Sequence, residues 1–204
     1  MSPSTCELEW AVASRPAAGE VVSGDVAVVE PRAEVMLFAV VDALGHGPGA
    51  AETAEAAGRA LRSYSGSDVV GALEHCHARL ARTRGAAVTV LALSTGEASL
   101  TCAGVGNIAV RLVHGSGPPP RRMDSAVPSF GVVGDRVGPV RSRELPLARG
   151  DVVLVATDGV DAAFAEWLDL SGSPPQIAER VIANHARNED DALVLVARVL
   201  RGPV

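Results

Sequence analysis

Aspartate residues stand at four places where a short apolar run rich in valine begins or ends. These residues are Asp25, Asp42, Asp158, Asp190 and Asp191. If the apolar runs are neighbouring strands of one core, their carboxylates come together, and repulsion between them must be relieved by protons or cations. Carboxylate oxygens at an open site suit Mg²⁺ or Mn²⁺. The pattern therefore predicts a site for a divalent metal ion.

Each aspartate, taken alone, also has a purely structural interpretation. Aspartate is common in turns and caps. Gly24–Asp25 could form a bulge, Asp158–Gly159 could form a turn, and residues 189–191 could be a solvated run of charge. Four such places, each joined to a strand, favour the metal site over these separate explanations.

The stretch "VVDALGHGPGA" (40–50) joins the second apolar run to a glycine-rich turn and the start of a helix. The turn resembles a phosphate-binding loop, but it lacks the GK[ST] motif, and Asp42 would repel a phosphate unless a metal intervened. His46 is a candidate catalytic residue because imidazole can donate a proton to a leaving group or orient a water. Its alternative role is to support the turn.

Composition and charge exclude several classes of protein. The 204 residues are 48% hydrophobic and 21% charged, with a net charge of −6 and no basic cluster, so we expect no nucleic-acid partner. The N-terminus lacks the features of a signal peptide, and the longest apolar runs are too short to span a membrane. We expect a cytoplasmic monomer that does not bind membranes.

The periodicity of apolar residues predicts an α+β fold in one domain over residues 1–204. Strands are expected as a hairpin at 21–30 and 34–41, a meander over 86–115, two runs at 139–147 and 151–156, and a closing run at 192–200. A helix from Pro48 would bury Ala50, Ala54, Ala57 and Leu61, and Ser67 or Asp68 would cap a second. Two short helices are expected near 161–168 and 174–186, and a surface loop or flap at 115–138.

The resulting order, ββ–αα–βββ–loop–ββ–αα–β, differs from the regular βαβ alternation of a doubly wound fold. Strands outnumber helices, and the helices come in consecutive pairs. We therefore expect two antiparallel sheets, each covered by a pair of antiparallel helices.

Four segments resemble, in the correct order, the signature motifs of a known enzyme family. They are "SGD" (23–25), "VVDALGHG" (40–47), "LVATDGVDA" (154–162) and "EDDALVLVAR" (189–198). Over nearly the whole chain they are similar to the metal-dependent protein phosphatases (PPM, type 2C), and most similar to the SpoIIE-like bacterial branch. The resemblance implies a four-layer αββα sandwich with a metal centre, holding two ions of Mn²⁺ or Mg²⁺, between the sheets.

The resemblance also implies roles for individual residues. Asp42 would bridge both ions, the Ala43 carbonyl would bind one, and Asp25 would act through a metal-bound water or in the outer coordination shell. The remaining ligands would be Asp158, Asp190 and Asp191. A metal-bridging water would attack phosphoserine or phosphothreonine. The size of the chain resembles that of stand-alone phosphatases of stressosome signalling, which implies a phosphorylated STAS-domain protein as substrate.

The chain departs from the family pattern at several positions. Ala43 replaces a glycine, Leu193 replaces a threonine, and "TDGVDAA" lacks the usual glutamate. Arg15 is the candidate for a phosphate-binding arginine. The departures suggest one alternative, a catalytically degenerate binding module in the same kind of signalling pathway. A hydrolase of small phosphate esters is a further alternative.

Overall fold

The computed structural model describes residues 7–32, 35–94, 96–115, 122–161, 163–165 and 168–201. These residues form two five-stranded antiparallel sheets, a short hairpin and three α-helices. Sheet A has the order β1 (Glu7–Arg15), β12 (Ala192–Arg201), β11 (Val152–Ala156), β6 (Ala109–Val113) and β7 (Met123–Ala126). Sheet B has the order β10 (Arg143–Pro146), β5 (Ser99–Val105), β4 (Ala86–Ser94), β3 (Val35–Ala43) and β2 (Asp25–Pro31). The hairpin pairs β8 (Gly131–Val132) with β9 (Arg136–Val137).

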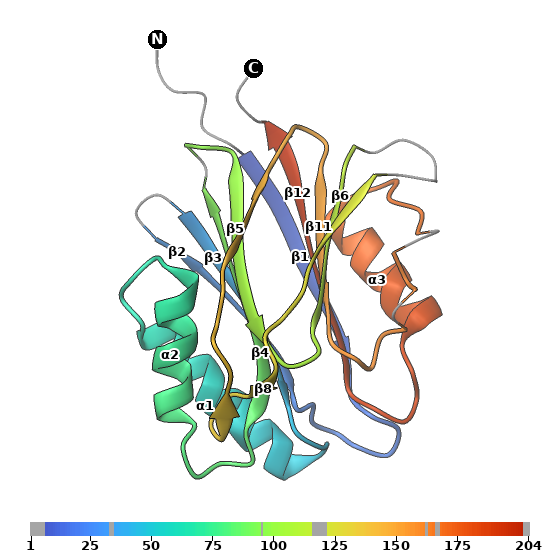
Figure 1. Ribbon diagram of the computed structural model, residues 1–204. Helices are drawn as coiled ribbons and strands as arrows, with labels where there is room; N and C mark the ends of the chain where they lie inside the picture. The colour runs from blue at the N-terminus through green and yellow to red at the C-terminus, as the bar shows by residue number, and fades with distance from the viewer. Residues whose placement is uncertain are drawn as a thin grey trace.

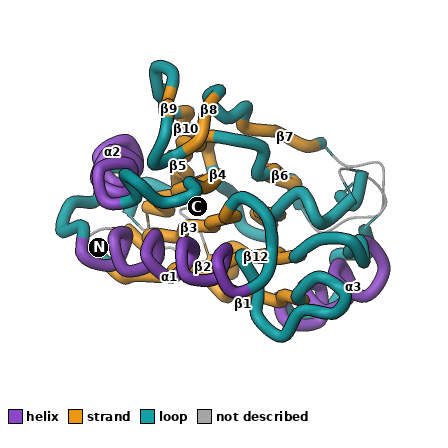
Figure 2. Tube along the Cα trace, turned by 90° about the horizontal axis from the view of Figure 1, so that it is seen from below, coloured by secondary structure: helices purple, strands orange, loops and turns teal. Residues whose placement is uncertain are grey.

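The two sheets face each other, and the helices cover their outer faces (Figure 1). Helices α1 (Pro48–Ser63) and α2 (Val69–Arg79) pack on sheet B, and α3 (Pro174–His185) packs on sheet A. Figure 2 views these layers along the strands, with α1 and α2 on one side and α3 on the other. The layered α+β fold predicted from the sequence is confirmed. No described helix is long and apolar enough to cross a membrane.

Strand β3 shows how the sequence pattern creates these layers. Leu37, Ala39 and Val41 pack against the helices, whereas Phe38 and Val40 pack between the sheets. Successive side chains of a strand point to opposite faces, so a strand that is apolar at every position can be buried on both. The continuous apolar run of β3 follows from its central place in the sandwich.

The first helix pair agrees with the sequence. Ala50, Ala54, Ala57 and Leu61 are buried along one side of α1. Asp68 is the N-cap of α2, where its side chain accepts a hydrogen bond of 2.6 Å from the Gly71 amide.

The second helix pair is only half formed among the described residues. Helix α3 is present, but Ala163–Ala165, within the helix predicted at 161–168, form a turn. The Ala163 amide donates to the Asp161 side chain at 2.9 Å, and the Phe164 amide donates to the Asp161 carbonyl. Such local aspartate turns compete with helix formation. The prediction of a helix there was wrong for these residues.

Two further segments differ from the expected elements. Strand β1, which the sequence reading missed, lies at the edge of sheet A and pairs with β12 along its whole length. The segment 115–138, expected as a loop or flap, contains β7, β8 and β9, while residues 116–121 lie outside the described part. Hydrogen bonds join Val133 to Ala86, at the start of β4, and Ser129 to the β5–β6 turn.

Candidate active site

Strand geometry brings Asp25 and Asp42 together. Asp25 begins β2, Asp42 is the next-to-last residue of β3, and the two residues are partners in the β2–β3 ladder. By strand alternation, Asp42 shares a face with Phe38 and Val40, which pack between the sheets. Asp25 likewise shares the inner face of β2 with Val29. Both carboxylates therefore lie at the rim of the core between the sheets.

Thr157 joins the two sheets at this rim. Its hydroxyl donates a hydrogen bond of 2.8 Å to Asp25, and it accepts one of 2.9 Å from the Leu193 amide. The Thr157 amide in turn donates to the Leu193 carbonyl at 3.0 Å. This buried threonine fixes the end of β11 against β12 and against Asp25 of the opposite sheet.

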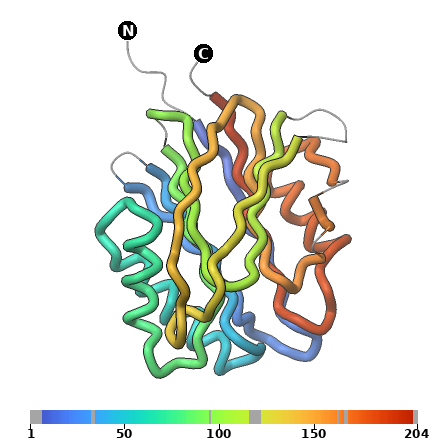
Figure 3. Tube along the Cα trace, viewed as in Figure 1, coloured from blue at the N-terminus to red at the C-terminus, as the bar shows by residue number. Residues whose placement is uncertain are grey.

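Asp158 follows Thr157 directly and reaches the same place. Its carboxylate accepts a hydrogen bond of 2.6 Å from the Asn107 side chain, in the β5–β6 turn, and it lies close enough to Asp42 to raise the pKa of that residue. The turns after β3, between β5 and β6, and after β11 lie at one end of the sandwich (Figure 3). Sheet A thus contributes Asp158 and sheet B contributes Asp42.

Asp190 and Asp191, on the turn before β12, have different surroundings. Both oxygens of the buried Asp191 carboxylate accept backbone hydrogen bonds, from the Ala17 amide at 2.8 Å and the Gly24 amide at 2.7 Å. Among the described residues, the Asp190 carboxylate accepts a hydrogen bond of 2.9 Å from the Asp191 amide. Asp191 therefore holds the β1–β2 connection in place, whereas Asp190 lies near the other aspartate side chains, including Asp158.

Electrostatics confirms that these side chains share one small volume. Burial raises the pKa of Asp42 from 3.8 to about 8, and repulsion from Asp25 and Asp158 contributes to that rise. Burial also raises the pKa of Asp25 to about 7, although the hydrogen bond from Thr157 opposes the rise. Burial raises the pKa of Asp190 as well. Protonation or a bound cation would relieve this repulsion.

The donor set fits a hard divalent cation, because every candidate ligand is an oxygen atom. Among the described residues, however, no three His, Cys, Asp or Glu side chains are arranged to hold a metal ion as they stand. Asp25 and Asp158 are each hydrogen-bonded to a neighbouring side chain instead. The carboxylates lie close together, but some of these side chains must change rotamer to bind an ion.

The positions that depart from the family pattern are compatible with the fold. Ala43 is not among the described non-glycine residues with positive φ, so a methyl side chain causes no backbone strain there. Its amide donates to the Gly24 carbonyl at 3.0 Å. Leu193 is buried in the core between the sheets. The substitution of alanine for glycine therefore leaves the Ala43 carbonyl available as a ligand.

His46 lies on the turn between β3 and α1, where its Nδ1 is 2.8 Å from a Glu20 carboxylate oxygen. Its positive charge would lower the pKa of Asp190, so it lies near the carboxylates. Arg15, the candidate phosphate ligand, donates instead to the Arg187 carbonyl at 2.6 Å.

Three residues of the site, Thr157, Asn107 and Glu20, were not predicted from the sequence. Thr157 adjoins Asp158 in the quoted "TDG", but no sequence pattern indicates the other two.

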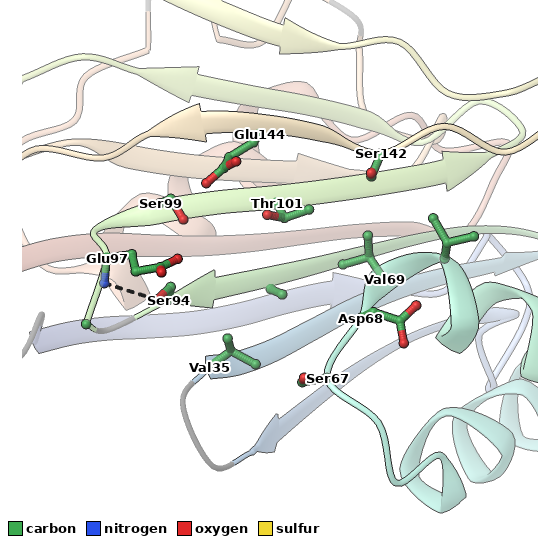
Figure 4. A pocket seen from close by; sticks show the side chains of 13 residues that line it. Val35, Ser67, Asp68, Val69, Ser94, Glu97, Ser99, Thr101, Ser142 and Glu144 are labelled. Atoms are coloured by element: carbon green, nitrogen blue, oxygen red, sulfur yellow. Dashed lines mark hydrogen bonds between the residues drawn. The ribbon is translucent and has the colours of Figure 1, made fainter.

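Two of the grooves along the described residues differ in their distance from the carboxylates. The larger, of about 840 Å³, is lined by hydroxyl and carboxylate side chains that include Thr101, Glu97 and Glu144 (Figure 4). Ser94 at its edge ends β4, whereas Ala87, which pairs with Asp42, is near the beginning of that strand. The larger groove is therefore remote from the carboxylates. A groove of about 590 Å³ includes Ala87 and Asn107 and adjoins them.

The comparisons with known proteins agree with this architecture. A model of the SpoIIE family (Stage II sporulation protein E) matches residues 32–200. The chain therefore belongs to the SpoIIE family, within the PPM class of protein phosphatases. The resemblance noted in the sequence motifs is thus confirmed.

One curated relative and two solved structures illustrate this similarity. Phosphoserine phosphatase RsbX of Bacillus subtilis (strain 168) is 24% identical over 143 residues, which is 70% of each chain. A crystal structure of RsbX in complex with magnesium has a TM-score of 0.81 at 20% identity, covering 95% of this chain and 98% of that one. A chain from work on the bacterial stressosome, a modular system adapted to control secondary-messenger signalling, has a TM-score of 0.83 at 27% identity, with 94% and 100% covered. The predicted enzyme class, a serine/threonine phosphatase, is confirmed.

Proposed function

We propose that this chain is a metal-dependent phosphatase that hydrolyses phosphoserine or phosphothreonine on a signalling protein. The observation that supports it most is the group of Asp25, Asp42, Asp158 and Asp190, brought from both sheets to one rim. The raised pKa values of Asp25 and Asp42, about 7 and about 8, also support the proposal, because a bound cation relieves repulsion between crowded carboxylates. Membership of the SpoIIE family supports the reaction class.

In this proposal Asp42 and the Ala43 carbonyl hold two ions of Mg²⁺ or Mn²⁺ together with Asp158 and Asp190. Asp25, fixed by Thr157, orients a water at the edge of the site. When bound, the ions would supply a more acidic water and offset the charge of the phosphoryl oxygens. Asp191 was predicted as a further ligand; because both of its oxygens accept backbone amides, we assign it the positioning of the β1–β2 connection.

The substrate we propose is a phosphorylated STAS-domain protein of a stressosome or partner-switching pathway. The similarity to a phosphoserine phosphatase, RsbX, and to a stressosome chain supports this choice. We propose that the chain acts in the cytoplasm as a monomer, without nucleic acid or membrane as a partner, in keeping with its acidic composition.

The test is turnover by the purified chain, freed of metal with a chelator and then supplied with Mn²⁺ or Mg²⁺. The substrates are p-nitrophenyl phosphate and a phosphorylated STAS-domain protein. We expect activity only with added metal, and its loss in Asp42→Asn and Asp158→Asn. Glu52→Gln, which alters an exposed carboxylate on α1, should leave activity unchanged. Full activity in both aspartate variants would refute the ligand assignment.

A catalytically degenerate binding module is the second candidate, favoured by Leu193 in place of a threonine and by the missing glutamate of "TDGVDAA". It predicts binding of the phosphoprotein without turnover under any metal condition. Calorimetric titration of Mn²⁺ into the chelator-treated chain separates the two, because the phosphatase requires bound ions and the binding module does not.

A further inference from the structure

An apolar groove extends from the carboxylates to the β8–β9 hairpin. At one end it is lined by Ala87, the strand partner of Asp42, and by Asn107, the hydrogen-bond partner of Asp158. Its other lining residues include Leu44, Phe130 and Val132. A molecule whose phosphate lies at the carboxylates therefore has this groove beside it.

Two large apolar side chains in this groove are exposed to solvent. Phe130 is 90% exposed and Leu44 is 48% exposed. Large apolar side chains gathered on a surface commonly mark an interaction site. Because both line one groove that adjoins the carboxylates, they form an apolar pair at the entrance to the candidate site.

The backbone that carries Phe130 is held firmly. The preceding residue, Ser129, accepts from the Gly106 amide at 3.0 Å and donates to the Gly104 carbonyl at 2.7 Å. The Phe130 carbonyl itself accepts from the Gly138 amide at 3.1 Å. Phe130 is thus displayed from a segment fixed to the β5–β6 turn, which also carries Asn107.

The opposite wall is fixed in a similar way. The Leu44 carbonyl accepts a hydrogen bond of 2.8 Å from the Arg84 guanidinium, and the Leu44 amide donates to the Gly85 carbonyl at 3.1 Å. The guanidinium lies over Gly49, where an added Cβ would be 2.3 Å from it. The backbone of both segments is therefore fixed by hydrogen bonds, so binding a ligand would cost the protein little backbone entropy.

We propose that this groove binds the polypeptide segment next to the phosphorylated residue of the substrate protein and seats an apolar side chain of that segment between Leu44 and Phe130. The inference rests on the proposed function. A protein segment fits because it joins a phosphate group to apolar side chains within a few residues. A small phosphate ester would reach the carboxylates without covering Phe130. The groove thus selects phosphoproteins over small esters.

The experiment compares Leu44→Ala, Phe130→Ala and the double variant with Val127→Ala. Val127 is 88% exposed on the same segment but does not line the groove, so it is the matched control. For each, kcat and KM are measured on p-nitrophenyl phosphate and on a phosphorylated STAS-domain protein. We expect kcat/KM on the phosphoprotein to fall about tenfold in the double variant, through KM, because apolar contact is lost. Activity on the small ester should stay within twofold.

Unchanged phosphoprotein kinetics, or an equal loss on both substrates, would overturn the proposal. Conversion of a dimer to a monomer by Phe130→Ala, with kinetics unchanged, would identify the groove as a self-interface and also overturn it. If the parent chain hydrolyses neither substrate, the proposed function fails, and calorimetric binding of the phosphoprotein still tests the groove. Weaker binding by the double variant than by Val127→Ala would then support the groove, and equal binding would refute it.

Discussion

Asp25 and Asp42 are directly opposite each other on neighbouring antiparallel strands, at the rim where the two sheets meet. Like charges in this position destabilise a sheet. The destabilising pair lies where Thr157 and Asp158 approach from the other sheet. A local conflict between charge and stability is typical of a functional site.

The first prediction concerns the stability of the metal-free chain as pH changes. Asp25 and Asp42 have pKa values of about 7 and about 8 when folded and 3.8 as the ordinary value, so the folded state binds more protons between these limits. The free energy of unfolding should therefore fall as pH rises from about 4 to about 8. Asp42→Asn should be more stable than the parent chain at pH 8 by on the order of 2 kcal/mol.

Urea denaturation in the presence of a chelator measures this difference. The comparison at pH 4, where the parent carboxyl groups are largely protonated, is the internal control and should show little difference. A parent stability that is constant or rises over this pH range would contradict the prediction. Saturating Mn²⁺ should restore stability at pH 8 if the carboxylates bind it.

The second prediction separates two buried threonines. Thr157→Val removes the hydrogen bond to Asp25 and leaves the buried Leu193 amide without its partner, so it should reduce the free energy of unfolding by about 1–3 kcal/mol. The Thr89 hydroxyl is buried with no hydrogen-bond partner among the described residues. Thr89→Val, measured by the same denaturation, should therefore be neutral or stabilising. Equal losses in both variants would show that the Thr157 bonds contribute nothing specific.

The third prediction concerns Gly159, the residue after Asp158. A Cβ on Gly159 would lie 1.9 Å from the Asp191 carbonyl oxygen, so Gly159→Ala must displace the turn before β12. We expect a loss of about 2–3 kcal/mol in the free energy of unfolding. Gly96→Ala, where nothing lies within 4 Å of the added Cβ, should change it by less than about 0.5 kcal/mol. An unchanged free energy of unfolding in Gly159→Ala would contradict this prediction and indicate that the turn can shift without loss of stability.

The fourth prediction tests His46 as a proton donor. The serine alkoxide is a poor leaving group and needs a proton, whereas p-nitrophenolate does not. His46→Ala should therefore reduce kcat on a phosphoserine protein by about 100-fold and change kcat on p-nitrophenyl phosphate only slightly. His75→Ala, on α2, is the control. Equal effects on the two substrates would assign His46 to support of the turn through Glu20.

Much of the fold could be read from the sequence because its elements are set by local patterns. The spacing of Ala50, Ala54, Ala57 and Leu61 predicts the buried side of α1, and the apolar run of β3 predicts a strand buried on both faces. Strand β1 was not predicted because it is an edge strand with no fully buried residue, so its sequence is less apolar than that of a central strand. The turn at Asp161 replaced a helix because a single side-chain hydrogen bond can outweigh a weak periodicity.

The residues capable of chemistry are evident from the sequence: aspartates at strand ends and a glycine-rich turn that carries His46. Which of them act together depends on how the two sheets pack. The tertiary structure placed Asp25 opposite Asp42, paired the Asp191 carboxylate with backbone amides, joined Thr157 to Asp25 of the other sheet, and brought in Asn107, which no spacing to the aspartates reveals. The physical reason is that strand pairing and sheet packing join residues far apart in the chain, and burial then sets their pKa values.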